Sequence, residues 1–193
     1  MDQIIVDMIE DPVFVQDLMR FTTDVRKKWT KQRADFMGVP VQAGSLYNDE
    51  VNVPMISPHF YEKYVLPYEI ELSKFYVGIN YWHSCGNIVQ LENLIKNIPN
   101  LEMVHISPWS DRQASVDNFR DSGISLEVVL HPLWDAQKVS VEEIAAHLTS
   151  IRSITADLPV TVRADGLQSI TTLENDLYSI LQWARLARNV LGE

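Results

Sequence analysis

The segment Ile79-Asn-Tyr-Trp-His83-Ser-Cys-Gly-Asn87-Ile-Val-Gln90 contains the clearest transition from strand to helix in the sequence. Its first five residues form a short aromatic and apolar run, which is typical of a β-strand. Asn87 and Gln90 have the spacing of a capping box, which predicts that a helix begins there. The expected apolar face of that helix consists of Ile88, Leu91, Leu94, Ile95 and Ile98. The segment therefore predicts one βα unit with a Ser-Cys-Gly turn between its two elements.

The same alternation continues toward the C-terminus. Apolar runs predict three more strands, over 101–107, 125–131 and 160–163. Three helical patterns follow them: Ala114, Val116 and Phe119 before Gly123, a helix capped by Ser140 and Glu143, and a final helix capped by Thr171 and Glu174. Each of these strands is thus followed by a helix.

A long helix and a strand are predicted upstream of this segment. Asp11 is a helix cap and Pro12 suits the first helical position, so a helix is expected over 11–36. Its apolar residues recur at helical spacing: Phe14, Leu18, Phe21, Val25 and Trp29. The basic residues of the same helix are interpreted as its solvated face: Arg26, Lys27, Lys28, Lys31 and Arg33. A strand is expected over 39–43, bounded by Gly44 and followed by a polar loop over 45–52.

A second long helix begins at Ser57-Pro58, where the combination of cap and proline recurs. It extends to Phe75, before Gly78, and Pro67 is expected to kink it. Five strands alternating with helices predict an α/β protein with a parallel sheet and helical crossovers, either doubly wound or part of a (β/α)₈ barrel. At about 39 residues for each βα unit a full barrel needs about 310, so the chain corresponds to about five-eighths of one. We expect a single domain over 1–193.

The composition excludes several classes of protein. A formal net charge of -10 argues against binding to nucleic acid or to an anionic membrane surface. Neither a signal peptide nor a run of about 20 apolar residues is present, so we expect a cytoplasmic protein outside the membrane. Cys85 is the single cysteine, which excludes a disulfide within the chain. The glycine motifs of dinucleotide-binding and P-loop proteins are missing from the sequence.

His83 and Cys85 form the most informative pair of side chains. Residues two apart in a strand point to the same side, so an imidazole nitrogen and a sulfur can meet at one point. Zinc takes such ligands. A helix beginning at Asn87 would in addition favour the thiolate of Cys85 through its N-terminal dipole. An ordinary packing role for the cysteine remains the alternative.

Three motifs together resemble the C-terminal half of the uroporphyrinogen decarboxylase superfamily, in particular its corrinoid-dependent methyltransferases. The motifs are Ser57-Pro58-x-x-Tyr61, Leu66-Pro67-Tyr68 and His83-Ser84-Cys85-Gly86-Asn87. The resemblance implies a partial (β/α)₈ TIM barrel in which His83 and Cys85 bind zinc. It also implies transfer of a methyl group from a corrinoid to a thiol. The early strands of that fold have no counterpart, so we expect a fragment, a split-gene product or a diverged half.

The methyltransferases of that family complete their zinc site with a second cysteine late in the chain, which this sequence lacks. Asp165 is the nearest substitute and His131 a rival, since both follow predicted strands. The decarboxylases of the family hold the substrate carboxylates with an arginine-rich N-terminal motif, which is also missing here. Tetrapyrrole decarboxylation by an assembled barrel is therefore an alternative activity. A further alternative is a non-catalytic half-barrel that needs a partner chain, or a second copy, to cover its open edges.

Other residues at predicted strand ends are candidate substrate contacts, because the chemistry of a parallel barrel lies at that edge. Asp49 follows the first strand, Trp109 the third and His131 the fourth. Trp109 is suited to form an apolar wall for a flat ligand, such as a corrinoid or another tetrapyrrole. An ordinary polar loop also explains Asp49, and a structural hydrogen bond also explains His131. His105 lies inside a predicted strand and is assigned no role.

Overall fold

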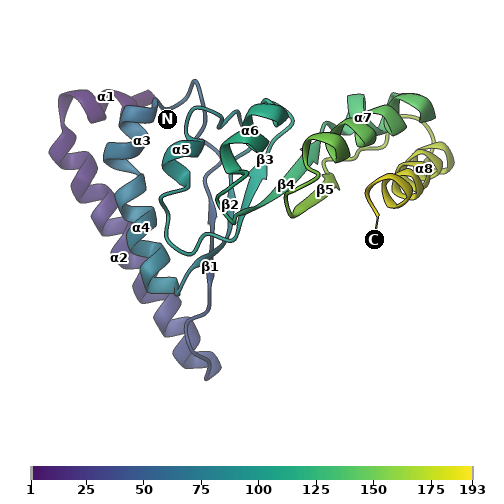
Figure 1. The fold of residues 1–193 in the computed structure, drawn as a ribbon. Coiled ribbons are helices and arrows are strands. Elements are labelled where there is room, and N and C mark those ends of the chain that lie inside the picture. Colours follow the sequence, from purple (N-terminus) through teal and green to yellow (C-terminus); the bar gives the residue numbers. More distant parts are fainter. Residues whose placement is uncertain (1, 193) are drawn as a thin grey trace.

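The computed structural model describes residues 2–192 and contains a five-stranded parallel sheet (Figure 1). The strands lie side by side in chain order: β1 Gly44–Tyr47, β2 Ile79–His83, β3 Met103–Ile106, β4 Ser125–Leu130 and β5 Val160–Ala164. A doubly wound sheet reverses its strand order at a switch point, and these five strands show no reversal. The predicted α/β class with parallel strands and helical crossovers is confirmed.

The helices lie beside the sheet, with a second layer of helices at the β1 end. Their bounds are α1 Asp2–Glu10, α2 Pro12–Met37, α3 Pro58–Tyr64, α4 Leu66–Tyr76, α5 Glu92–Ile95, α6 Arg112–Phe119, a π-helical turn Pro132–Gln137, α7 Val141–Ile154 and α8 Leu173–Leu191. Figure 1 shows α2 outside α3 and α4 at the β1 end of the sheet, and α7 with α8 at the β5 end. Among residues 2–192, no helix combines the length and the apolar character needed to cross a bilayer.

Several predicted helix boundaries are confirmed by their caps. The Asp11 carboxylate accepts a hydrogen bond from the Phe14 amide at the start of α2, and Ser140 and Glu143 form a complete capping box on α7. The kink expected at Pro67 is a full break, and the helix divides into α3 and α4 two residues before the proline. The break follows because proline has no N–H to continue the helical ladder.

The strand predicted over 39–43 is wrong, because β1 covers Gly44–Tyr47 instead. Gly44 pairs with Ile79 of β2, and Leu46 becomes almost fully buried. A Cβ atom on Gly44 would lie 2.5 Å from the ring atom Cδ2 of Tyr76, so only glycine fits where the strand passes this ring. The glycine expected to end the strand is therefore its first residue.

Two predicted helix starts are also wrong. The carbonyl oxygen of Asn87 accepts the Val53 amide at 2.8 Å in an isolated bridge, so the backbone there cannot enter a helix. Only the short helix α5 forms, five residues later, and no side chain caps it. The final helix begins one residue later than predicted, with Thr172 as its cap, because the Thr171 hydroxyl donates to Asp176 at 2.9 Å.

The apolar side of α2 lies in solvent, although the helix itself forms as predicted. Its buried residues are few and small or polar: Val15, Thr23, Thr30 and Ala34. The residues whose spacing predicted the helix are 36–65% exposed, and we call them the α2 apolar stripe: Phe14, Leu18, Phe21, Val25 and Trp29. A row of large exposed apolar side chains of this kind is typical of an interaction surface.

A buried carboxyl group, that of Glu69 on α4, connects the helix layer to the ends of β1 and β2. It accepts hydrogen bonds from the Tyr61 hydroxyl at 2.5 Å, the Asn48 amide at 2.6 Å and the Trp82 indole N–H at 3.1 Å. Burial raises the pKa of Glu69 to about 7, and the hydrogen bonds oppose this rise only in part. Burial therefore favours the neutral form of Glu69 at a pH where an exposed glutamate is charged.

We expect Glu69→Gln to remove a pH dependence of the folding stability. Because the pKa of this carboxyl is about 4.3 in the unfolded chain and higher in the folded one, the wild type loses stability as the pH rises between these two values. The loss should be on the order of 1–3 kcal/mol. Urea unfolding at about pH 5 and about pH 8 measures it. The same pH dependence in both proteins would contradict the role of Glu69.

Candidate metal centre

Three potential metal ligands lie at the carboxyl ends of β1 and β2. His83 is the last residue of β2, Cys85 follows two residues later, and Asp49 lies two residues beyond the end of β1. Tyr47 and His83 are partners in the parallel register, and the Asn48 amide donates to the His83 carbonyl oxygen at 2.8 Å. The two strands therefore bring the loop that carries Asp49 beside the His83 ring.

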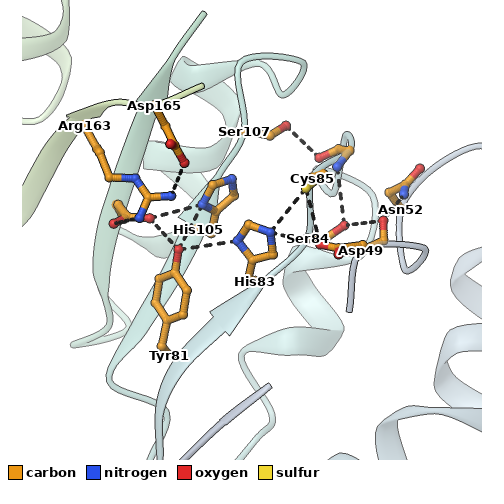
Figure 2. A network of polar contacts seen from close by, with 12 residues as sticks. Asp49, Asn52, Tyr81, His83, Ser84, Cys85, His105, Ser107, Arg163 and Asp165 are labelled. Atoms are coloured by element: carbon orange, nitrogen blue, oxygen red, sulfur yellow. Dashed lines mark hydrogen bonds and ion pairs between the residues drawn. The ribbon is translucent and has the colours of Figure 1, made fainter. Parts of the chain in front are cut away.

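The ligand atoms of these three residues form a small triangle (Figure 2). His83 Nε2 lies 3.0 Å from Asp49 Oδ1 and 3.3 Å from Cys85 Sγ, and Sγ lies 3.3 Å from Asp49 Oδ1. The His83 side chain is 13% exposed and that of Asp49 is 64% exposed. The His83 side chain is thus largely buried against the sheet, whereas the Asp49 side chain is exposed to solvent.

Close packing between the loop after β1 and the loop after β2 fixes the arrangement of the three candidate ligands. A Cβ atom on Gly86 would lie 2.3 Å from Cγ of Asn52, so glycine is required where the second loop passes the first. Ser107 donates to the Gly86 carbonyl oxygen at 2.7 Å, which ties the same turn to the end of β3. The glycine of the His-Ser-Cys-Gly segment therefore has a steric role beside the candidate ligands.

The surroundings of Cys85 favour its thiol form over the thiolate. Burial raises its pKa first, and the hydrogen bond to Asp49 and the negative charges of Asp49, Asp165 and Glu50 raise it further. The prediction that a helix N-terminus at Asn87 favours the thiolate is wrong, because no helix begins there. A cation beside the sulfur would reverse this preference.

Asp165, the predicted third zinc ligand, lies outside the group formed by Asp49, His83 and Cys85. Its carboxylate accepts the Gly166 amide at 2.7 Å and pairs with Arg163 at 2.6 Å. The Gly166 hydrogen bond and the Arg163 charge hold the pKa of Asp165 below its ordinary range. Asp49, predicted as a substrate contact, occupies the position beside His83 and Cys85 instead.

Trp109 and His131 meet at a different place. Their rings are in edge contact, with centroids 5.3 Å apart, and both line a cleft of about 620 Å³ together with Trp134 and Asp135. His131 Nδ1 accepts the backbone amides of Leu133 and Trp134, at 3.2 and 3.3 Å, so this nitrogen caps the π-helical turn. His131 is therefore not brought into the ligand group as the rival of Asp165.

A polar cluster that the sequence did not reveal lies beside the candidate metal ligands. Tyr81, His105, Glu127 and Arg163 come from β2, β3, β4 and β5, and hydrogen bonds or ion pairs join them. His105, which was assigned no role, packs its ring 4.2 Å from the His83 ring, and burial lowers its pKa. The sequence does place a polar residue inside each of several apolar strands. Burying such a side chain is costly unless it finds a polar partner, so these residues could have been expected to meet.

No family model matches this chain, and no curated protein matches it significantly. The resemblance based on the Ser57-Pro58 and His83-to-Asn87 motifs therefore stays a prediction.

We expect Asp49→Asn to make Cys85 more reactive. Removing one negative charge 3.3 Å from the sulfur lowers the pKa of the thiol, so more thiolate is present at a given pH. The rate of alkylation by iodoacetamide at about pH 8 should rise several-fold, and its pH profile should move to lower pH. Asp121→Asn, the same change beyond the far end of α6, is the control. Equal rates in the two variants would show that Asp49 does not act on the sulfur.

Proposed function

We propose that the chain binds a zinc ion through Asp49, His83 and Cys85. The observation that supports this most directly is the convergence of three ligand atoms within 4.8 Å of one another. Zinc accepts carboxylate oxygen, imidazole nitrogen and thiolate sulfur. Ligand atoms around a tetrahedral zinc lie about 3.3–3.7 Å apart. The separations of 3.0 and 3.3 Å therefore need only small side-chain adjustments to fit the ion.

The local electrostatics supports a divalent cation at this point. Asp49, Asp165 and Glu50 together create a negative field at the Cys85 sulfur, because each of them raises the pKa of the thiol. A field of this sign disfavours a free thiolate and favours a bound cation. Binding of the metal should therefore release the thiol proton.

We propose that this site supports methyl transfer from a methyl-corrinoid to a thiol substrate. Three protein ligands leave a fourth position open, and the exposed sides of Asp49 and Cys85 give a substrate access to it. Zinc bound there would lower the pKa of the substrate thiol. The thiol proton would leave to solvent, the thiolate would form the carbon–sulfur bond, and the electron pair of the broken cobalt–carbon bond would remain on cobalt. His83 at the end of β2 and Cys85 just beyond it would contribute by holding the ion.

The arrangement of the sheet is compatible with part of a (β/α)₈ barrel, which we propose as the fold. The strands follow in chain order, as they do in a barrel. The candidate ligands lie at the carboxyl ends of the strands, where the chemistry of such barrels is found. The polar cluster of Tyr81, His105, Glu127 and Arg163 would then face the barrel interior.

We expect the wild type to bind about one zinc ion per chain, and His83→Ala and Cys85→Ala to weaken binding by at least about 100-fold. Asp49→Ala should weaken it as well, because it removes the third ligand. Asp165→Ala is the matched control and should change affinity only a few-fold, since that carboxylate is paired with Arg163. Metal analysis after dialysis and competition with a chelator measure these affinities.

The zinc proposal is contradicted if purified wild type exposed to excess zinc retains none. Loss of binding in Asp165→Ala but not in Asp49→Ala would contradict the choice of ligands. The reaction is tested separately, by the absorbance change when methylcobalamin and a small thiol are mixed with zinc-loaded protein. A rate no greater than that of the His83→Ala variant would argue against methyl transfer.

A second proposal concerns the α2 apolar stripe, which we propose pairs with the same stripe of a second copy of this chain. Asp17 and Lys28 lie along one flank of the stripe, about three helical turns apart. Neither forms an ion pair with another residue of the described chain. In two antiparallel helices, Asp17 of each copy lies opposite Lys28 of the other, so both charges and the apolar residues find partners.

We expect the wild type to be a dimer in analytical ultracentrifugation and Phe21→Glu to be a monomer. Phe21 is 65% exposed at the middle of the stripe, so the substitution should spare the fold while placing two like charges in the interface. Val141→Glu, at an exposed apolar position of α7, is the control and should remain dimeric. A monomeric wild type would exclude a second copy as the occupant of the stripe.

A further inference from the structure

The cleft that contains Trp109 and His131 lies between α6 and α7, which are neighbours in Figure 1. None of the three candidate metal ligands lines it. Its volume of about 620 Å³ is within the range of small-molecule sites. Trp109 is 63% exposed and Trp134 is 59% exposed, and both line the cleft. Two exposed indole rings in one cleft leave a large apolar area that a ligand can cover.

The aromatic rings of the cleft form a corner around His131. The Trp109 and His131 rings are nearly perpendicular, at 86°, with centroids 5.3 Å apart. The His131 and Trp134 rings are inclined by only 32°, with centroids 6.2 Å apart, so the two indole planes stand at a steep angle to each other. Lys138 Nζ lies over the Trp134 ring, 5.9 Å from its centroid. A flat ring stacked on Trp109 therefore presents its edge to Trp134, a geometry that aromatic rings favour.

The backbone of the π-helical turn determines which nitrogen of His131 carries the proton. Nδ1 lies 3.2 Å from the Leu133 amide nitrogen and 3.3 Å from that of Trp134. A backbone N–H can only donate, so Nδ1 is the acceptor and the proton of the neutral ring is on Nε2. Among residues 2–192, Nε2 has no hydrogen-bond partner, and it is not one of the buried polar atoms that lack one. His131 therefore offers a ligand a free N–H donor beside Trp109.

The charged groups that line the cleft are paired with one another, which favours an uncharged ligand. The buried Asp135 carboxylate accepts hydrogen bonds from Arg112 Nη2 at 2.7 Å and from the His131 amide at 2.9 Å. Its other oxygen lies 3.2 Å from His147 Nδ1. A charged ligand would have to compete with these contacts, whereas an uncharged acceptor needs only the His131 N–H.

We propose that this cleft binds a flat, uncharged aromatic compound that carries a carbonyl group, of which an oxopurine is an example. The ring stacks on Trp109, its edge faces Trp134, and its carbonyl oxygen accepts the hydrogen bond from His131 Nε2. Stacking on an aromatic side chain supplies much of the affinity for such rings. The hydrogen bond selects ligands that have an acceptor at the ring edge. This site goes beyond the proposed zinc site and does not depend on it.

The test uses caffeine as the probe, because it is a flat, uncharged oxopurine with carbonyl acceptors. Indole is the comparison ligand, since it is flat but has no carbonyl. Both are titrated into the metal-free protein, and nitrogen-15 NMR follows the indole N–H signals of the five tryptophans. A parallel titration of N-acetyltryptophanamide measures stacking on an isolated indole. We expect the Trp109 and Trp134 signals to saturate together at about 1 mM caffeine or below, and indole to bind at least several-fold more weakly.

Three variants test the assigned contacts. Trp109→Ala should weaken caffeine binding by about 10-fold or more, because it removes the stacking surface. His131→Asn should weaken it by about 2- to 10-fold, because asparagine keeps an oxygen that can cap the turn but lacks the ring N–H. Tyr178→Ala removes a similarly exposed aromatic ring from α8, outside the cleft, and should leave the affinity unchanged. The remaining tryptophan signals show whether each variant is folded.

The site is overturned if caffeine gives no saturable shift of the Trp109 and Trp134 signals, or binds no more tightly than it binds N-acetyltryptophanamide. Equal affinity in Trp109→Ala and Tyr178→Ala would also overturn it. Indole binding as tightly as caffeine, or an unchanged affinity in His131→Asn, would overturn the assigned class of ligand. Because the titrations use metal-free protein, none of these outcomes depends on whether zinc binds.

Discussion

The parallel register between β1 and β2 is the constraint on which the candidate site depends. Tyr47 lies opposite His83, and the Asn48 amide donates to the His83 carbonyl oxygen. This hydrogen bond sets the point at which the first strand ends beside the second. Because a parallel strand continues into its loop at the same edge, Asp49 must pass the imidazole ring. A slip of one residue would turn alternate side chains to the other face and separate the ligands.

The polar cluster beneath the site follows from the cost of burying polar groups. Glu127 and His105 are almost fully buried, which is tolerated because each finds a partner on a neighbouring strand. Arg163 adds a positive charge beside the carboxylate. The sheet thus positions its polar residues across four strands, and the same hydrogen bonds that satisfy them also restrict the orientation of His83.

The helices show which structural features local sequence patterns can predict and which they cannot. Caps such as Asp11 and the Ser140 capping box involve residues three apart, so the sequence predicts them correctly. The start expected at Asn87 fails because its carbonyl is paired with Val53, a residue far away in the chain. The α2 apolar stripe is a second example. The spacing of its residues predicts a helix, but not whether another surface covers them.

The sequence by itself determined the α/β class, the alternation of elements and the meeting of His83 with Cys85, because these depend on periodicity and on neighbours in the chain. Only the tertiary structure decided the third member of the group, which is Asp49 and not Asp165. Both residues follow strands, so local sequence cannot rank them. The difference arises from the pairing of Asp165 with Arg163 and from the strand register that brings Asp49 to the ring, and both are contacts made in space.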